Sequence, residues 1–201
     1  VTFASVQKAF AIPPGLAVAA VSNRALEKSK NVPNRGYYFD FQNFAKFAEK
    51  NQTPTTPVVP HIMALHYQCE KLVKEGMENV WARHKKMAEF GRSWAKEKFK
   101  LFCEEKYASD TLTTVKNSRG INVAETISAL QQKHNTVFGN GYGKLKEQTF
   151  RIAHMGHVNA PMMLGTLGAL EIALDVLGMI NETSKSGIKA ATNYLADALK
   201  E

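Results

Sequence analysis

The sequence contains little cysteine and no long hydrophobic segment. Only two of its 201 residues are cysteines, Cys69 and Cys103, and neither belongs to a CxxC or Cys/His metal-binding pattern. Both fall in sequence that favours a helix, which indicates reduced, partly buried thiols in a cytoplasmic protein. No apolar run approaches the roughly 20 residues of a membrane-spanning helix. Disulfide-rich and membrane-spanning classes are therefore excluded.

Motifs of several common enzyme classes are also missing. The sequence has no P-loop and no Ser-His-Asp pattern, and the glycine-rich segment 139–143 lacks the strand and helix that flank a dinucleotide-binding GxGxxG. His154 and His157 do not form a metal-binding pair, because their spacing crosses a strand end and a glycine with no third ligand nearby. Structural roles are expected for both histidines, and no metal is expected.

The chain has a formal net charge of +8, and many of its basic residues lie in one helical stretch. In that stretch the basic residues are interleaved with acidic ones, which is typical of a solvated helix face rather than of a nucleic-acid surface. A site for small anionic substrates fits this charge equally well. The basic residues are Arg83, Lys85, Lys86, Arg92, Lys96, Lys98 and Lys100, and the acidic ones are Glu89, Glu97, Glu104 and Glu105.

The first half of the chain predicts two short strands followed by helices. Strands are expected over residues 1–6 and 16–21, and Ser22 and Asp40 are expected to cap the next two helices. Residues 37–39 are expected to be extended, and the proline-rich segment 52–60 is expected to be an extended loop. Helices follow over 61–75 and 79–102, with Gly76 between them and Val80, Met87, Phe90, Trp94 and Leu101 near one face.

The second half predicts a β-α-β-β-α order. Strands are expected over 111–116, 135–138 and 148–155. Asn122 and Glu125 form a capping box for a helix to about residue 133, and Asn159 caps an apolar helix to about residue 180. A further helix is expected over 185–200. This order predicts a small α+β layer with helices on one face of an antiparallel sheet.

Lys8 is the first candidate for chemistry. It follows a short β-prone run and precedes the Pro13-Pro14-Gly15 turn, so its backbone is expected to be fixed and its neighbours apolar. Desolvation of that kind lowers the pKa of an ammonium group and frees the amine for Schiff-base chemistry. An ordinary lysine at the edge of a strand fits the same residues.

Arg151 is the second candidate. Alternation along residues 149–155 places Phe150, Ile152 and His154 on one face of a strand and Arg151 on the other. A guanidinium inside such a strand needs an anion, and its planar fork suits a carboxylate bound through two parallel hydrogen bonds. A salt bridge to an internal Asp or Glu is the alternative. The glycine-rich segment 139–143 is expected to be a loop that places this strand.

The loop Thr53-Pro54-Thr55-Thr56-Pro57 is a weaker candidate. Hydroxyl and backbone N–H groups on a proline-stiffened loop just before a helix can bind a phosphate. An ordinary turn would have the same composition.

Four segments follow one another along the chain: Ser-x-Gln-Lys-Ala…Pro-Pro-Gly at 5–15, Tyr-Tyr-Phe-Asp at 37–40, Thr-Pro-Thr-Thr-Pro at 53–57 and Arg-Ile-x-His-Met-Gly at 151–156. Together they resemble the C-terminal half of a class V aminotransferase of the alanine–glyoxylate and serine–pyruvate type. The resemblance implies the α/β fold of type I pyridoxal-phosphate transferases. It also implies a large-domain remnant over 1–60, connecting helices over 61–105 and a small α+β domain over 106–201.

The resemblance also assigns roles to residues. It implies that Lys8 forms the Schiff base with pyridoxal phosphate and moves the substrate proton, and that Gln7 lines the cofactor pocket. Arg151 matches the arginine that binds the substrate carboxylate. Gln52, Thr53 and Thr55 match a loop that reaches the cofactor phosphate of the neighbouring subunit in a homodimer, although Gln52 stands where some relatives have tyrosine.

One departure from the family concerns the position of the lysine. In the family it lies near the middle of a chain roughly twice as long. The phosphate-binding turn, the ring-stacking aromatic and the Asp that pairs with the ring nitrogen are therefore expected outside this sequence. The resemblance implies transamination between serine or alanine and a 2-oxo acid such as glyoxylate or pyruvate. A non-catalytic fragment or split subunit that dimerises is one alternative, and a lyase or desulfurase on the same scaffold is another, although helical positions for Cys69 and Cys103 disfavour a desulfurase.

Overall fold

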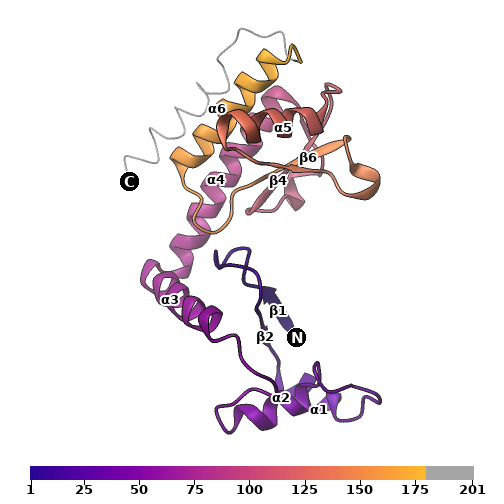
Figure 1. The fold of residues 1–201 in the computed structure, drawn as a ribbon, viewed down its shortest axis with the longest axis vertical. Coiled ribbons are helices and arrows are strands. Elements are labelled where there is room, and N and C mark those ends of the chain that lie inside the picture. Colours follow the sequence, from indigo (N-terminus) through magenta and orange to yellow (C-terminus); the bar gives the residue numbers. More distant parts are fainter. Residues whose placement is uncertain (180–201) are drawn as a thin grey trace. The chain divides into compact units, whose positions relative to one another are not determined.

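The computed structural model describes residues 1–179, and the chain divides into two compact units, residues 1–74 and residue 75 onward. This division lies within the segment 61–105 that was expected to hold connecting helices. The helix expected over 185–200 lies outside the described residues. Figure 1 shows the order of the elements along the chain. Within residues 1–179, every helix is too short or too polar to cross a lipid bilayer.

The first unit begins with a two-stranded antiparallel sheet, as its sequence predicts. Strands β1 (Thr2–Ser5) and β2 (Ala17–Ala20) pair with Ser5 opposite Ala17. Three helices follow, α1 (Asn23–Ser29), α2 (Phe41–Ala48) and α3 (Val59–Glu75). Both expected caps are confirmed, because Ser22 accepts a hydrogen bond from the Ala25 amide and Asp40 accepts one from the Gln42 amide.

Two expectations for the first unit are wrong. Helix α3 already includes Val59 and Pro60, which were expected to lie in an extended loop. Proline is tolerated in the first turn of a helix, where its missing N–H would have no partner anyway. Residues 37–39 form a bend and a turn rather than an extended segment, and they lead directly into the Asp40 cap.

The second unit is an antiparallel sheet combined with helices. Its strands are β3 (Lys100–Leu101), β4 (Leu112–Lys116), β5 (Gly139–Asn140) and β6 (Thr149–Ala153), in the spatial order β3-β4-β6-β5. Its helices are α4 (Met77–Lys98), α5 (Val123–His134) and α6 (Ala160–Val176), with short 3-10 turns η1 (Glu105–Tyr107) and η2 (Gly143–Leu145). Asn122 and Asn159 cap α5 and α6 as expected.

The core of this unit lies between the three helices and one face of the sheet (Figure 1). Buried residues alternate along β4 and β6, so the inner face presents Val115, Phe150 and Ile152 to Trp94 of α4 and Leu170 of α6. This confirms the expected α+β layer. The other face of the sheet is not covered by these helices, and it carries Arg151.

Two elements of the second unit differ from expectation. Helix α4 ends at Lys98 rather than near residue 102, because Lys100–Leu101 pairs with β4 as a short strand. The strand expected over 135–138 is also misplaced. Asn135 ends α5 in the left-handed conformation, with φ of 48°, and the strand begins only at Gly139.

Candidate functional site

The loop between β1 and β2 carries Lys8 on a tight turn. The Ala11 amide donates to the Lys8 carbonyl at 2.9 Å, and Ala11 has a left-handed backbone with φ of 53°. Val6 and Ile12 are buried at the two ends of this turn, and the Ile12 amide donates to the Val6 carbonyl. The backbone of Lys8 is therefore fixed, as its sequence context predicts.

The side chain of Lys8 is exposed, which corrects the expectation that apolar neighbours desolvate it. Val6 and Ile12 are buried, whereas Gln7, Lys8 and Ala9 all face outward. Within residues 1–179, the Lys8 amine takes part in no hydrogen bond or ion pair. Lys8 therefore combines a fixed backbone with an amine that has no partner in the described part of the chain.

Two hydrogen bonds fix the threonine loop, residues 53–57 between α2 and α3. One lies within the loop and the other comes from Tyr37. The Thr53 hydroxyl donates to the Thr55 carbonyl at 2.6 Å, and the Tyr37 hydroxyl donates to the Pro54 carbonyl at 2.9 Å. Thr53 and Thr55 are both exposed, and the Thr55 hydroxyl has no partner within the described part of the chain. Tyr37 is a supporting residue that sequence analysis missed, because no local pattern links it to a proline 17 residues away.

Gln52 is less available for a ligand than the two threonines. Its backbone amide already donates to the Phe47 carbonyl at 3.0 Å and closes the end of α2. This amide cannot also donate to a phosphate without opening the helix end. The Gln52 amide is therefore removed from the phosphate donors expected on this loop, and the side chain of Gln52 remains.

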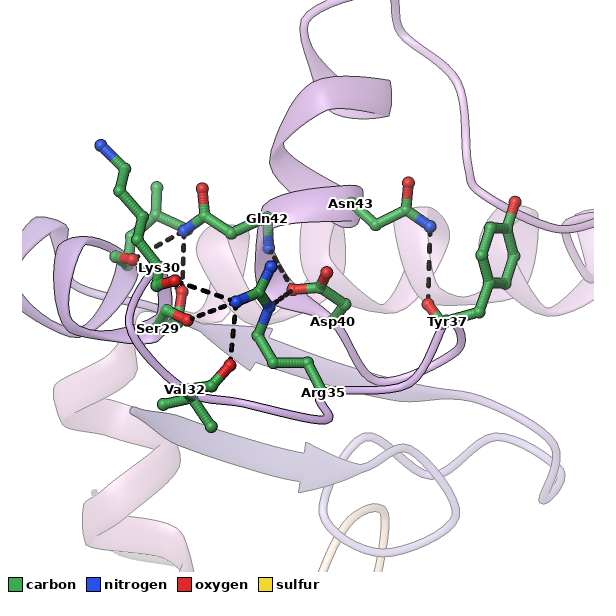
Figure 2. A network of polar contacts seen from close by, with 9 residues as sticks. Ser29, Lys30, Val32, Arg35, Tyr37, Asp40, Gln42 and Asn43 are labelled. Atoms are coloured by element: carbon green, nitrogen blue, oxygen red, sulfur yellow. Dashed lines mark hydrogen bonds and ion pairs between the residues drawn. The ribbon is translucent and has the colours of Figure 1, made fainter.

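An arginine-centred network supports the segment that carries Tyr37 (Figure 2). The Arg35 Nε donates to Asp40 at 2.9 Å, and Gln42 Nε2 donates to the Leu26 carbonyl at 2.7 Å. Arg35 Nη1 also binds three carbonyl oxygens at the end of α1 and just beyond it, those of Ser29, Lys30 and Val32. The network ties α1 to α2 and fixes the chain entering the Tyr37 turn.

The threonine loop borders an apolar cavity of about 620 Å³ in the first unit. Strand β2 and the aromatic side chains of Phe3, Phe39 and Phe44 line the cavity together with Thr53 and Thr55. Lys8 is not among its lining residues. The lysine and the threonine loop of one chain therefore do not meet in this cavity.

Arg151 lies on the open face of β6, in the second unit. Its Nε donates to the Asn140 carbonyl at 3.0 Å, and its guanidinium carbon lies 3.9 Å from the centre of the Tyr142 ring. Gly139 lies opposite Arg151 in the β5–β6 register, and a Cβ on Gly139 would come within 2.7 Å of Arg151 Nη2. Gly139 and Asn140 thus form strand β5 rather than part of the loop expected over residues 139–143, and Gly139 leaves room for the Arg151 guanidinium.

The two Nη groups of Arg151 have no hydrogen-bond partner among the described residues. Among residues 1–179, no carboxylate forms an ion pair with Arg151, and only its Nε takes part in a hydrogen bond. The internal salt bridge that was the alternative for this residue is therefore not formed within the described residues. The two Nη groups together make the planar fork that binds a carboxylate through parallel hydrogen bonds.

The residues that follow Arg151 have structural roles. His154 is buried, and a hydrogen bond of 2.9 Å joins its Nε2 to the Thr113 hydroxyl. Burial lowers the pKa of His154 to about 4. The Gly156 amide donates to His84 Nε2 at 3.1 Å, and the Gly156 carbonyl accepts from Arg83 at 2.9 Å. Helix α4 therefore holds the segment that leaves the Arg151 strand.

The two cysteines differ from expectation in their exposure, and Cys103 also differs in its secondary structure. Cys69 lies in α3 as expected, but Cys103 lies in the bend after β3, outside any helix, because α4 ends earlier than predicted. Both thiols are free and exposed rather than partly buried. The helix argument against a desulfurase therefore holds for Cys69 and fails for Cys103.

The basic helix is more buried than its composition predicts. Arg92 and Lys98 on α4 are only 8% and 4% exposed, so the expectation of a fully solvated face is wrong for these two. Arg92 lies 3.3 Å from Asp110, and Lys96, on a more exposed part of the helix, pairs with Glu105 at 2.9 Å. The charges of Arg92 and Lys96 are thus neutralised locally.

No protein-family model matches the chain, but individual proteins do. It is 36% identical over 192 residues to an uncharacterized aminotransferase of Methanocaldococcus jannaschii, covering 94% of this chain and 49% of that protein. It is 33% identical to the small subunit of a soluble hydrogenase of a Synechococcus strain, covering 96% and 50%. It is 34% identical to the serine–glyoxylate aminotransferase of Hyphomicrobium methylovorum, covering 94% and 48%. The chain spans about half the length of the curated relatives it matches.

Solved structures agree with these sequence relatives. The pyridoxamine–pyruvate aminotransferase of Mesorhizobium loti superposes with a TM-score of 0.86 at 26% identity, covering 94% of this chain and 50% of that one. The ureidoglycine–glyoxylate aminotransferase of Bacillus subtilis has a TM-score of 0.88 at 20% identity, with 96% and 51% covered, and it shows the shared fold. These likenesses confirm the fold class that the sequence predicts.

Proposed function

This chain belongs to the class V aminotransferases of the serine–glyoxylate and alanine–glyoxylate type, and from that premise we propose that it forms one half of a pyridoxal-phosphate-dependent transaminase. The proposed reaction transfers an amino group between serine or alanine and a 2-oxo acid such as glyoxylate or pyruvate. The observation that carries this proposal is that the guanidinium of Arg151 has no carboxylate partner among the described residues. The two free cysteines favour a reducing, cytoplasmic setting.

Lys8 fits the cofactor through the chemistry of its amine. When bound, pyridoxal phosphate supplies an aldehyde that condenses with an amine and a conjugated ring that accepts electrons from the substrate α-carbon. The exposed amine of Lys8 would hold the cofactor and, once displaced by substrate, would carry the proton of the α-carbon. A fixed backbone with a free tip suits both roles, because only the side chain has to move.

Arg151 would bind the carboxylate that amino-acid and 2-oxo-acid substrates share. Asn140 and Tyr142 fix its orientation before any substrate arrives, so little rotamer entropy is lost on binding. Holding the carboxylate at two points fixes the rest of the substrate relative to the cofactor. The same fork serves both half-reactions.

The threonine loop is proposed to act across a homodimer. The hydroxyls of Thr53 and Thr55, with the side chain of Gln52, would bind the cofactor phosphate held by the partner subunit. The cavity beside the loop supports this arrangement, because Thr53 and Thr55 line it and Lys8 does not. Gln7, exposed beside Lys8, would line the pocket of its own subunit.

Reductive labelling tests the role of Lys8. The protein is incubated with pyridoxal phosphate and reduced with borohydride, and the modified peptide is identified by mass spectrometry. We expect the label on Lys8 and its loss in Lys8→Arg, with Lys50→Arg as an exposed control on the same unit. Labelling of another lysine, or no labelling of the protein at all, would contradict the proposal and favour a non-catalytic subunit.

Substitution of Arg151 tests the carboxylate site separately. Arg151→Lys keeps the charge but loses the planar fork, so we expect the KM for both substrates to rise roughly 10- to 100-fold. The affinity for pyridoxal phosphate should stay near the parent value. Arg24→Lys, an exposed position on α1, is the matched control. Equal loss of substrate and cofactor affinity would refute this role.

A further inference from the structure

Helix α3 carries two side chains that bind the backbone of the Lys8 loop. Gln68 Nε2 donates to the Phe10 carbonyl at 2.8 Å, and Gln68 is only 6% exposed. His61 Nε2 forms a hydrogen bond of 2.9 Å with the Pro14 carbonyl. These contacts bridge 58 and 47 residues of sequence, and the proposed reaction steps do not use either side chain.

The two contacts act from one face of a rigid element. His61 and Gln68 are seven residues apart, which is close to two helical turns, so their side chains lie on the same side of α3. Gly15 lets the loop approach this closely, because a Cβ there would lie 2.9 Å from His61 Nε2. Helix α3 thus holds the loop at two points, after Lys8 and before β2.

The turn that carries Lys8 needs such support. Ala11 closes the turn with φ of 53°, a conformation that costs an L-residue free energy and persists only when its surroundings impose it. The buried side chains of Val6 and Ile12 hold the base of the turn, and the Gln68 amide binds the carbonyl immediately before Ala11. An amide is a neutral donor, so Gln68 holds the backbone without placing a charge beside the Lys8 ammonium.

We propose that Gln68 and His61 are positioning residues, which fix the backbone of the Lys8 loop on α3 while leaving the Lys8 side chain free to react. This inference rests on the proposed role of Lys8. It predicts that losing either contact loosens the turn and makes Lys8 react more slowly and less selectively, without removing its amine.

Hydrogen exchange measured on the protein tests the contacts directly. Gln68→Met keeps the length of the side chain and removes its donor, so the Ala11 amide should exchange roughly tenfold faster. Gln68→His places an Nε2 donor at a similar reach and should restore slow exchange. His66→Ala, an exposed histidine on the same helix, is the control and should leave the exchange rate unchanged. Exchange in Gln68→Met within twofold of the parent rate would refute the proposal.

The rate of borohydride-trapped labelling at Lys8 gives the functional readout. We expect His61→Leu and Gln68→Met to lower this rate relative to labelling at exposed Lys50, and His61→Gln to restore it. A general loss of folding would affect both lysines and would not be rescued by a donor. If the parent protein is labelled elsewhere, the role of Lys8 fails, whereas the exchange experiment still decides whether α3 holds the loop. Faster exchange with unchanged Lys8 labelling would refute the positioning role.

Discussion

Acid is expected to destabilise the second unit through His154. The imidazole is buried, which lowers the pKa of His154 from its ordinary value of about 6.5 to about 4, and the nearby positive charge of Arg92 adds to this effect. The folded unit therefore prefers the neutral ring, whereas the unfolded chain protonates it near pH 6.5. The contribution of neutral His154 to the free energy of unfolding is therefore complete above that pH and is lost as the pH falls toward 4.

The magnitude follows from the two pKa values. Linkage between protonation and folding gives a loss of about 2 kcal/mol from His154 between about pH 7.5 and about pH 5. The total approaches about 3 kcal/mol below pH 4, where both states are protonated. Such a change is a substantial fraction of the usual stability of a domain, which is about 5–15 kcal/mol.

Urea unfolding followed by the fluorescence of buried Trp94 measures this effect. We expect the parent to lose about 2 kcal/mol more than His154→Gln when the pH is lowered from about 7.5 to about 5. His134→Gln, at an exposed position near the end of α5, is the matched control and should retain the parent's pH dependence. A difference between parent and His154→Gln below about 0.5 kcal/mol would refute the reasoning.

Two further predictions concern the surroundings of Arg151. Gly139→Ala places a Cβ within 2.7 Å of Arg151 Nη2 and should displace the guanidinium, so we expect the KM for amino acids to rise roughly tenfold. Gly165→Ala is the control at a helical position with open space, and it should instead stabilise the protein by about 0.5–1 kcal/mol. An unchanged KM in Gly139→Ala would contradict the close approach. Tyr142→Leu should weaken substrate binding roughly two- to fivefold through loss of the cation–π contact, while Tyr142→Phe should bind as the parent does. Equal KM values in the two Tyr142 variants would argue against a role for the ring.

Local signals in the sequence predicted the elements that local chemistry fixes. Ser22, Asp40, Asn122 and Asn159 each begin a helix because a short polar side chain accepts a backbone amide two or three residues later. The end of α4 depends instead on a partner. Lys100–Leu101 becomes a strand because β4 offers it hydrogen bonds, and nothing within the segment itself reveals that partner.

The candidate site shows the same distinction between features that local sequence fixes and features that depend on a partner element. Alternation alone placed Arg151 on the face of its strand opposite Phe150 and Ile152, and the structure confirms that placement. The contact with Tyr142 depends on how β5 pairs with β6, and the contacts of Gln68 and His61 depend on where α3 packs. The desolvation expected for Lys8 failed for a related reason, since composition shows that apolar neighbours exist but not which way they point.

The charge environment of Arg151 distinguishes it from arginines with structural roles. Arg35, Arg83 and Arg92 each lie near a carboxylate of this chain, at 2.9, 2.8 and 3.3 Å. Within residues 1–179, Arg151 has only a carbonyl and a ring face as partners, and neither neutralises its charge. A guanidinium held in one orientation without a counter-ion gains more from an incoming carboxylate than one already paired, because no existing ion pair has to be broken. This difference in partners is the physical reason to place the substrate carboxylate at Arg151.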